Sequence, residues 1–238
     1  MCRHLDLQTT HQSFIAYIPL LGKPVRLKNV IAIHQPTNRR KVMLSTHWDT
    51  RPVADWERDP LRRRRPILGA NDGASGVAVL LELARVFHDQ PPTVGAIFVF
   101  FDGEDSGERG NDGYCLGSRY MAEHLSPAWE FEKGINLDMV GDRDLSIPIE
   151  GHSWDKARTL AISFWKVASL LYPQTFPNEP SEPVFDDHVP FLDLHKPFIN
   201  LIDFDYRYWH TLEDTEDKCS SQSLERVGRA VARFVQGL

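Results

Sequence analysis

The run Ala96–Phe101, with the sequence AIFVFF, constrains the fold more than any other feature of this chain. Six consecutive apolar residues have the length of a β-strand, and a strand without a polar face has to be covered on both sides. Strands of that kind lie in the middle of sheets that carry helices on their faces. We therefore expect Ala96–Phe101 to be a central strand of an α/β sheet.

Strands and helices alternate along the rest of the chain. Short apolar runs predict strands, and apolar residues with helical spacing predict helices. The predicted strands are Lys41–Ser45, Ala96–Phe101, Gly134–Val140 and Phe198–Ile202, and the predicted helices are Gly76–Asp89, Leu116–Leu125, Asp155–Leu171 and Leu224–Val235. This alternation predicts the α/β class, with a central mixed, mostly parallel sheet flanked by helices on both faces. The stretch before Pro36 is interpreted as strands at one edge of that sheet.

The length and composition suit a single domain. The chain has 238 residues, of which 42% are hydrophobic, so one large α/β domain spanning residues 1–238 can bury its own core. A core of that size needs no structural metal or disulfide framework, so a bound metal would serve catalysis.

Acidic residues and histidines follow the predicted strands, at the edge where open α/β sheets bind their ligands. They are His47, Asp49, Asp102, Glu104, Asp105, Asp138, Asp203, Asp205 and His210. Asp72 lies in the Gly-rich turn GANDGASG, just before a predicted helix. We expect these carboxylates and imidazoles to meet at one edge of one sheet.

A divalent cation would reconcile so many acids at one place. Two unit charges about 4 Å apart repel by about 4 kcal/mol at an effective dielectric constant of about 20. Nitrogen and oxygen ligands without a thiolate suit zinc in a catalytic site. The sequence therefore predicts a catalytic metal site, with zinc as the preferred ion.

Each of these residues also has an ordinary structural interpretation. An Asp after a strand is usually a helix cap or a turn residue, and this interpretation is kept for Asp49, Asp55 and Asp102. His47 alone would be a loop histidine, and His210 alone could be packed in a pocket wall. Capping poorly explains the adjacent acids Glu104 and Asp105, however, and the coincidence at several strand ends favours the metal site.

The charge balance points away from nucleic acid as the main partner, because the formal net charge is −6. The basic run Arg62–Arg65 is interpreted as a solvated loop rather than as a phosphate-binding patch. No stretch is long and apolar enough to predict a membrane span.

The three cysteines are Cys2, Cys115 and Cys219. They match neither a disulfide framework nor a thiolate zinc site, although one bridge stays open if the protein is exported. The opening MCRHLDLQTT lacks the apolar centre of a signal peptide, so the chain itself does not reveal its compartment.

Six motifs occur in a fixed order along the chain: PILGANDGASGVAVLLELAR, VFFDGED, YCLGSRYMAEHL, INLDMVGD, DDHVPFL and YWHTLEDTED. As a set they resemble glutaminyl cyclases of the animal type and, more so, their bacterial relatives. These enzymes share a fold with the co-catalytic zinc aminopeptidases. The resemblance runs from about Val30 to the C-terminus, and it implies a zinc aminopeptidase-like α/β hydrolase fold. It also implies a periplasmic or secreted location, if an export signal has been removed.

The resemblance assigns roles to individual positions. Three residues match the zinc ligands: Asp72, Asp105 and His210. Glu104 matches the general acid/base, and Trp209 matches an aromatic wall of the pocket for the glutamine side chain. Asp138 and Asp186 match a hydrogen-bonded acid pair near the base. His47 matches a position that binds a second zinc in the aminopeptidases and stays unliganded in the cyclases.

Two departures from the family accompany this match. Asn200 stands where animal cyclases have a histidine, which puts the hydrogen bonds of the acid pair in question. The N-terminal helices of the family are expected to be shortened or absent.

The resemblance implies a zinc-dependent glutaminyl-peptide cyclotransferase, which converts the N-terminal glutamine of peptides to pyroglutamate and releases ammonia. Its partners would be peptide or protein N-termini that begin with glutamine. The alternative is an aminopeptidase with two co-catalytic zincs, because His47, Asp72, Asp105, Asp138 and His210 would serve a two-metal site equally well. The pair Trp209–His210 and the run Asp186–His188 favour the cyclase. A non-catalytic module on the same fold is the third hypothesis, disfavoured because the base and the ligands are all present.

Overall fold

A computed structural model describes residue 5 and residues 7–35, 37–108 and 113–238. Its elements alternate as the sequence predicts. The strands are β1 Gln8–Ile18, β2 Lys23–His34, β3 Lys41–His47, β4 Gly95–Phe101, β5 Lys133–Asp138 and β6 Phe198–Ile202. The α-helices are α1 Ala74–Asp89, α2 Leu116–Glu123, α3 Gly151–Lys156, α4 Arg158–Leu171, α5 Val189–Asp193 and α6 Ser221–Gln236. Short 3₁₀ turns are η2 Pro19–Leu21, η3 Glu104–Ser106, η4 Pro127–Trp129 and η5 Glu216–Lys218.

The strands form one mixed sheet of six strands in the order β1-β2-β4-β3-β5-β6. The strands β4, β3, β5 and β6 run parallel to one another, whereas the long hairpin β1–β2 joins β4 in the antiparallel sense. Every residue of β4 is buried, as its uninterrupted apolar sequence requires. The α/β class, the mixed sheet and the central place of Ala96–Phe101 are thus confirmed, and so are the edge strands before Pro36.

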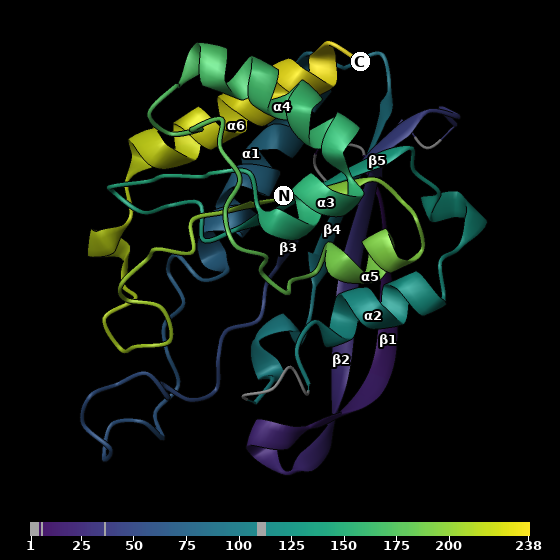
Figure 1. Cartoon of the computed structure of the whole chain (residues 1–238). Helices are drawn as coiled ribbons and strands as arrows, with labels where there is room; N and C mark the ends of the chain where they lie inside the picture. The colour runs from purple at the N-terminus through teal and green to yellow at the C-terminus, as the bar shows by residue number, and fades with distance from the viewer. Residues whose placement is uncertain (1–4, 6, 36, 109–112) are drawn as a thin grey trace.

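Helices pack in two groups around this sheet. In one group α6 contacts both α1 and α4, and in the other α2 contacts α5. Figure 1 shows the first group at the top of the view and the second at the lower right, with strands between them. Gly76 lets α1 approach β3 closely, because a Cβ at this position would lie 2.1 Å from Thr46 Oγ1.

Several predicted boundaries differ from the structure, and three of the differences change how a residue or an element is interpreted. The strand β3 continues to His47, which pairs with Phe101, so His47 is a strand residue and not a loop histidine. The strand β5 stops at Asp138, because Met139 turns the chain with a φ of 47°. The single helix predicted over Asp155–Leu171 is two helices, α3 and α4, separated at Ala157. Among the described residues, no helix has the length and apolar character needed to cross a bilayer.

Candidate functional site

The carboxyl ends of the four parallel strands meet at one edge of the sheet. His47 at the end of β3 lies opposite Phe101 at the end of β4, and Asp138 at the end of β5 lies opposite Ile202 at the end of β6. This register brings the residues that follow each strand together, as the topology predicts. A pocket of about 390 Å³ opens there. Its lining includes Asp72, Glu104, Asp105, Asp138, Trp209 and His210.

Asp72, Asp105 and His210 form a buried cluster, which we call the open cluster. One possible ligand atom from each lies within 4.8 Å of those from the other two. His210 Nε2 is 3.0 Å from Asp105 Oδ1 and 3.7 Å from Asp72 Oδ2. Both Asp72 Oδ2 and Asp105 Oδ2 are buried without a hydrogen-bond partner in the part of the chain that the structure describes. Two unsatisfied carboxylate oxygens beside an imidazole nitrogen fit a bound cation.

His47, Asp72 and Asp138 form a second buried cluster, which we call the closed cluster. His47 Nε2 lies 3.0 Å from Asp138 Oδ1 and 3.2 Å from Asp72 Oδ1. Its Nδ1 lies 3.1 Å from the carbonyl oxygen of Asp49. The glycine at position 73 permits this arrangement, because a Cβ there would approach the His47 ring to 2.6 Å. Asp72 is therefore shared by two clusters.

The electrostatics of both clusters favour a positive charge between the carboxylates. Burial alone would lower the pKa of His210, but the charge and hydrogen bond of Asp105 raise that pKa to about 9. Burial opposes protonation of His47 in the same way, and Asp138 outweighs it and raises the pKa of His47 well above its usual value. A metal ion at either imidazole would compete with such a proton for the same nitrogen.

Glu104 stands beside the open cluster at the start of η3. The Asp49 carboxylate accepts hydrogen bonds from the backbone N–H groups of Glu104 and Asp105, both at 3.1 Å, and so fixes the start of this turn. The Cys115 thiol donates to Glu104 Oε1 at 3.5 Å. Burial raises the pKa of Glu104 well above its usual value; His47 opposes this shift, and the charge of Asp105 adds to it. Asp49, interpreted from the sequence as a cap or turn residue, thus holds the start of η3 from a distant part of the chain.

Asp186 lies in the same pocket but is held by amides. Asn136 Nδ2 donates to its Oδ1 at 3.1 Å, and Asn200 Nδ2 donates to its Oδ2 at 2.6 Å. Asp138 instead bonds to His47 at 3.0 Å. The two acids that the family resemblance pairs therefore each have their own partner, and Asn200 is one of those partners. Burial, together with the nearby Asp186 charge, raises the pKa of Asp138 to about 7 against the effect of His47.

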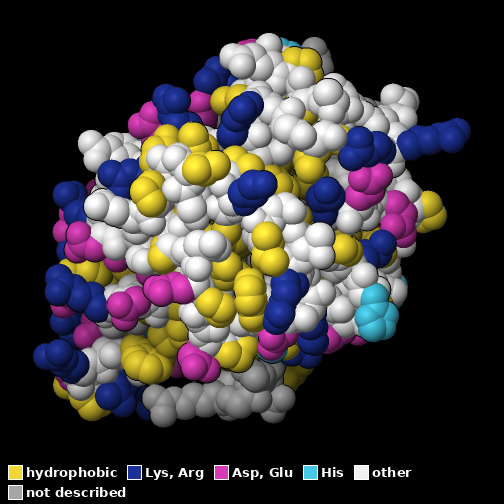
Figure 2. Space-filling view, turned by 45° about the horizontal axis from the view of Figure 1, so that its top comes forward, with side chains coloured by type: hydrophobic (Ala, Val, Ile, Leu, Met, Phe, Trp, Pro, Cys, Tyr) yellow, Lys and Arg dark blue, Asp and Glu magenta, His cyan; other side chains and the backbone are white. Residues whose placement is uncertain are grey.

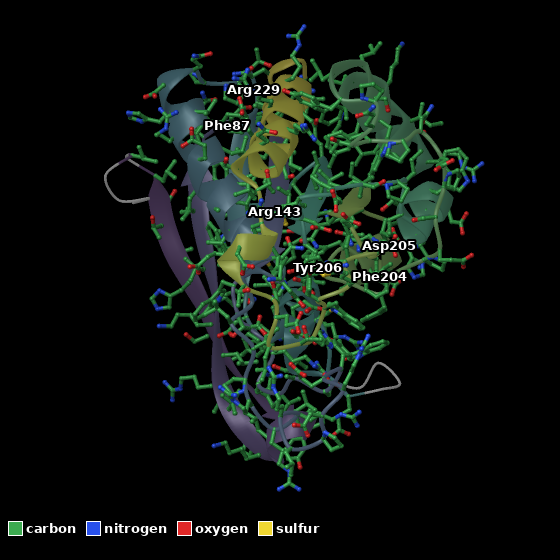
Figure 3. The ribbon with its side chains drawn as sticks, turned by 90° about the vertical axis from the view of Figure 1, so that its left-hand side faces the viewer. Phe87, Arg143, Phe204, Asp205, Tyr206 and Arg229 are labelled. Atoms are coloured by element: carbon green, nitrogen blue, oxygen red, sulfur yellow. The ribbon has the colours of Figure 1, made fainter. Side chains whose placement is uncertain are left out.

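Aromatic side chains form one wall of the pocket. The Trp209 ring stacks on the His210 ring, with centroids 3.7 Å apart and planes 29° apart. The ring centroid of Trp56 lies 5.0 Å from that of Trp209, and the ring centroid of Phe204 lies 5.1 Å from that of Trp209. Figure 3 shows Phe204 on the segment that follows β6, close to Tyr206. The predicted place of Trp209 at the pocket agrees with this structure, while Trp56 and Phe204 are additions that the sequence did not single out.

Arg51 is the principal polar residue of the site that sequence reasoning missed. Its side chain is 1% exposed and its Nη1 donates to Asp105 Oδ1 at 3.0 Å. Its Nε and Nη2 each donate to the Asp55 carboxylate at 2.8 Å, and Asp55 in turn lies 3.5 Å from His210 Nδ1. Asp55, interpreted from the sequence as a turn residue, thus links Arg51 to the open cluster. A guanidinium buried beside a carboxylate fixes the direction of that carboxylate.

Asp214 supports the other side of the open cluster. Its carboxylate accepts from the backbone N–H groups of Asn71 and Asp72 at 2.9 and 3.2 Å, and from the Tyr206 hydroxyl at 2.8 Å. Burial raises the pKa of Asp214 to about 6. Tyr206 is therefore buried and hydrogen-bonded to Asp214, and neither Tyr206 nor Tyr208 lines the pocket.

Other residues noted in the sequence lie outside the site. Arg62–Arg65 are exposed on a loop, as predicted. Asp102, interpreted as a turn residue, accepts from the backbone N–H of Lys28 at 2.7 Å. Cys115 and Cys219 are both free thiols, so these two do not form the bridge left open by the sequence, and Cys2 lies outside the described residues.

Comparison with known proteins agrees with this geometry. The family model of peptidase family M28 matches residues 29–235. The chain belongs to peptidase family M28. The chain is similar to a glutaminyl-peptide cyclotransferase of Drosophila melanogaster, with 28% identity over 98% of this chain and 70% of that protein. It is also similar to an aminopeptidase of Bacillus subtilis, with 28% identity over 87% of this chain but only 44% of that protein.

Several solved structures resemble the whole chain. The glutaminyl cyclase of Tannerella forsythia superposes with a TM-score of 0.94 at 33% identity, covering 100% of this chain and 87% of that one. A Zn-dependent exopeptidase of Parabacteroides distasonis superposes with a TM-score of 0.95 at 30% identity, covering 100% of this chain and 86% of that one. Both named activities are therefore found on the same backbone, and the choice between them depends on the site.

Proposed function

We propose that this chain is a glutaminyl-peptide cyclotransferase that converts an N-terminal glutamine to pyroglutamate and releases ammonia. The observation that carries the proposal is the open cluster, with its unsatisfied oxygens, directly beside the stacked pair Trp209 and His210 in one pocket. Cyclisation needs a cavity that receives a side-chain amide and a base within reach of the α-amine. The similarity to several glutaminyl cyclases supports the same conclusion.

Zinc is the ion that we propose for the open cluster. Two carboxylates and one imidazole are a ligand set that zinc accepts in catalytic sites, with a fourth position left for substrate. Asp72, Asp105 and His210 would hold it. When bound, the ion would supply Lewis acidity toward the side-chain carbonyl oxygen of the glutamine.

Glu104 is the residue that we propose for proton transfer. In the reaction the α-amine nitrogen forms a bond to the side-chain amide carbon, and the bond from that carbon to the amide nitrogen breaks. Glu104 would accept a proton from the attacking amine and return it to the departing nitrogen, which leaves as ammonia. The backbone hydrogen bonds to Asp49 and the thiol of Cys115 hold Glu104 at the pocket for this role.

Trp209 would keep the substrate folded for this intramolecular attack. Its indole is fixed on one face by the His210 ring, so its position does not depend on the substrate. A flexible glutamine side chain loses its rotational freedom on binding, and a rigid aromatic wall reduces the space that it can explore.

A two-metal aminopeptidase is the alternative, because the closed cluster presents His47, Asp72 and Asp138 as a further candidate metal site. Such an enzyme needs a metal-bound hydroxide to attack a peptide bond. His47 Nε2 already lies within 3.2 Å of an oxygen of both Asp138 and Asp72 in the closed cluster, which favours a single metal ion.

Two peptides, one beginning with Gln and one with Leu, test the proposal. The zinc-loaded protein is expected to remove the mass of one ammonia molecule from the first and to block its N-terminus, while the second stays intact. Mass spectrometry of both after incubation decides the outcome. Release of free leucine with no change in the Gln peptide would overturn the cyclase and establish the aminopeptidase.

A further inference from the structure

Tyr114, the first residue of the motif YCLGSRYMAEHL, lines the pocket of the open cluster and has no role in the proposed function. It directly precedes Cys115, whose thiol donates to Glu104 Oε1. The backbone N–H of Cys115 also donates to the carbonyl oxygen of Glu104 at 2.9 Å, so Cys115 is bound to the proposed base twice. Tyr114 therefore keeps a fixed place relative to that base.

Two contacts fix the ring of Tyr114. The Arg51 guanidinium lies over this ring, 5.5 Å from its centroid. Gly107 also packs against the ring, because a Cβ at this glycine would lie 2.0 Å from Tyr114 Cδ2. Arg51 Nη2 donates to the carbonyl oxygen of Gly107 at 3.1 Å, and Arg51 Nη1 donates to Asp105 Oδ1 at 3.0 Å. The ring and the open cluster thus share one support.

The hydroxyl of Tyr114 is a donor with no partner in the part of the chain that the structure describes. Burial raises the pKa of Tyr114 to about 12; the charge of Arg51 opposes this shift, and the charges of Asp105 and Glu104 add to it. The hydroxyl therefore keeps its proton at neutral pH. A half-buried O–H group that lines a pocket without an internal partner is available to a ligand.

The acidic lining of the pocket indicates which group of a substrate needs such a donor. Ionised carboxylates accept hydrogen bonds but donate none, and five carboxylic acids line the pocket: Asp72, Glu104, Asp105, Asp138 and Asp186. A peptide that begins with glutamine brings two carbonyl groups close together, one in the side chain and one in the bond to the second residue. The proposed metal ion takes the side-chain carbonyl, so the main-chain carbonyl requires a donor from the protein.

We propose that the Tyr114 hydroxyl donates a hydrogen bond to the main-chain carbonyl oxygen of the N-terminal glutamine and so positions the substrate beside the base. This inference rests on the proposed function. Because every peptide has this carbonyl, the contact does not depend on the second residue. Figure 2 shows Lys and Arg side chains interspersed with Asp and Glu side chains over the face that it draws, so no field of one sign on that face selects peptides by charge.

The variant Tyr114→Phe tests the inference, because it removes the hydroxyl and keeps the ring beneath Arg51. For the peptide Gln-Ala, KM is expected to rise about five- to tenfold while kcat stays within about twofold, since the bound substrate and the transition state share the contact. The zinc content per chain should not change. Tyr120→Phe is the matched control and should alter neither constant. Tyr120 is a half-buried tyrosine of α2 that stacks on Phe14 and does not line the pocket.

Two small substrates, the α-methylamide and the α-methyl ester of glutamine, locate the acceptor. They differ only in the group, NH or O, that is attached to the main-chain carbonyl, and an ester carbonyl accepts hydrogen bonds more weakly than an amide carbonyl. The rise in KM caused by Tyr114→Phe is therefore expected to be larger for the methylamide than for the ester. Peptides that begin with Gln-Glu and Gln-Lys should show the same rise as Gln-Ala.

An unchanged KM in Tyr114→Phe, or an equal rise for the methylamide and the ester, would overturn this inference and leave the proposed function standing. A fall in kcat at constant KM would overturn it as well, because the hydroxyl would then act only in the transition state. If the unmodified protein releases ammonia from none of these substrates, the proposed function fails too.

Discussion

The open cluster and the closed cluster share Asp72 but differ in how their buried atoms are satisfied. In the closed cluster, one imidazole nitrogen of His47 lies within 3.2 Å of both carboxylates. In the open cluster, Asp72 Oδ2 and Asp105 Oδ2 have no hydrogen-bond partner among the residues that the structure describes. Leaving a buried acceptor unsatisfied costs about 1–3 kcal/mol, and more for a charged group.

This difference indicates what each cluster is built to hold. In the closed cluster, His47 Nε2 faces an oxygen of each carboxylate, so those oxygens already have a partner within the protein. The open cluster has to gain a cation from outside to satisfy its oxygens. One histidine and two aspartates therefore make a structural arrangement in the closed cluster and a candidate metal site in the neighbouring open cluster, and the surrounding hydrogen bonds decide which.

The largest effect is expected from removing the imidazole of the open cluster. His210→Ala is expected to lose the bound zinc and, with it, activity by a factor on the order of 10³ or more, since a Lewis-acid metal contributes several kcal/mol to the transition state. Elemental analysis of zinc per chain, together with turnover of a Gln peptide, measures both effects.

The matched variant His47→Gln breaks the closed cluster instead. We expect it to retain one zinc per chain and to lose stability, because Asp138 would lose the charged partner that lies 3.0 Å away. Two zincs per unmodified chain, with one lost in His47→Gln, would contradict the comparison and favour the aminopeptidase.

Glu104→Gln is expected to give the next largest effect. The amide has nearly the shape of the carboxylate but accepts no proton, so turnover should fall by about 10²–10⁴-fold. Zinc content should remain that of the unmodified protein, because Glu104 is not part of the open cluster. Near-normal turnover would remove Glu104 from the proposed mechanism.

A third buried histidine–carboxylate pair, outside both clusters, provides a test at acid pH. Glu150 Oε2 lies 3.0 Å from His188 Nε2. Burial alone would raise the pKa of Glu150, but His188 and backbone N–H groups lower it to about 2, below its ordinary value of 4.5. The pair therefore stabilises the fold fully above about pH 4.5, and this contribution of about 3 kcal/mol is lost as the pH falls toward 2.

Urea unfolding between pH 2.5 and pH 5 measures this contribution. The free energy of unfolding is expected to depend less steeply on pH in Glu150→Gln than in the unmodified protein. Because the pair belongs to neither cluster, the difference between the two proteins should be the same with zinc and after chelation. A difference that changes on chelation would show that the pair is coupled to the open cluster.

The smallest effect is expected at Arg51, whose guanidinium contacts Asp105 of the open cluster. Arg51→Gln removes the guanidinium that lies 3.0 Å from Asp105 Oδ1, and groups that orient a metal ligand typically contribute about 10–100-fold to metal affinity. Competition with a zinc chelator measures the change. Arg51→Lys keeps the charge without the bidentate fork. We therefore expect its zinc affinity to lie between that of Arg51→Gln and that of the unmodified protein. Unchanged zinc affinity in Arg51→Gln would show that Asp105 needs no such support.

Much of the site could be predicted because strand ends can be read from the sequence. The acids after Ala96–Phe101 and the histidine after Phe198–Ile202 follow apolar runs that define the sheet, and parallel strands bring their carboxyl ends to one edge. Arg51 and Asp55 were missed as site residues because they lie in a long polar loop without periodicity. Nothing in such a loop distinguishes a buried arginine from an exposed one such as Arg62.

The sequence by itself determined the alternation of strands and helices, the ligand types available at the sheet edge, and the order of motifs that resembles glutaminyl cyclases. Only the tertiary structure decided the partner of each acid. Asp138 bonds to His47, whereas Asp186 bonds to Asn136 and Asn200. The physical reason is that hydrogen bonds form only within about 3 Å. Strand register and packing set such distances, and residue type alone does not.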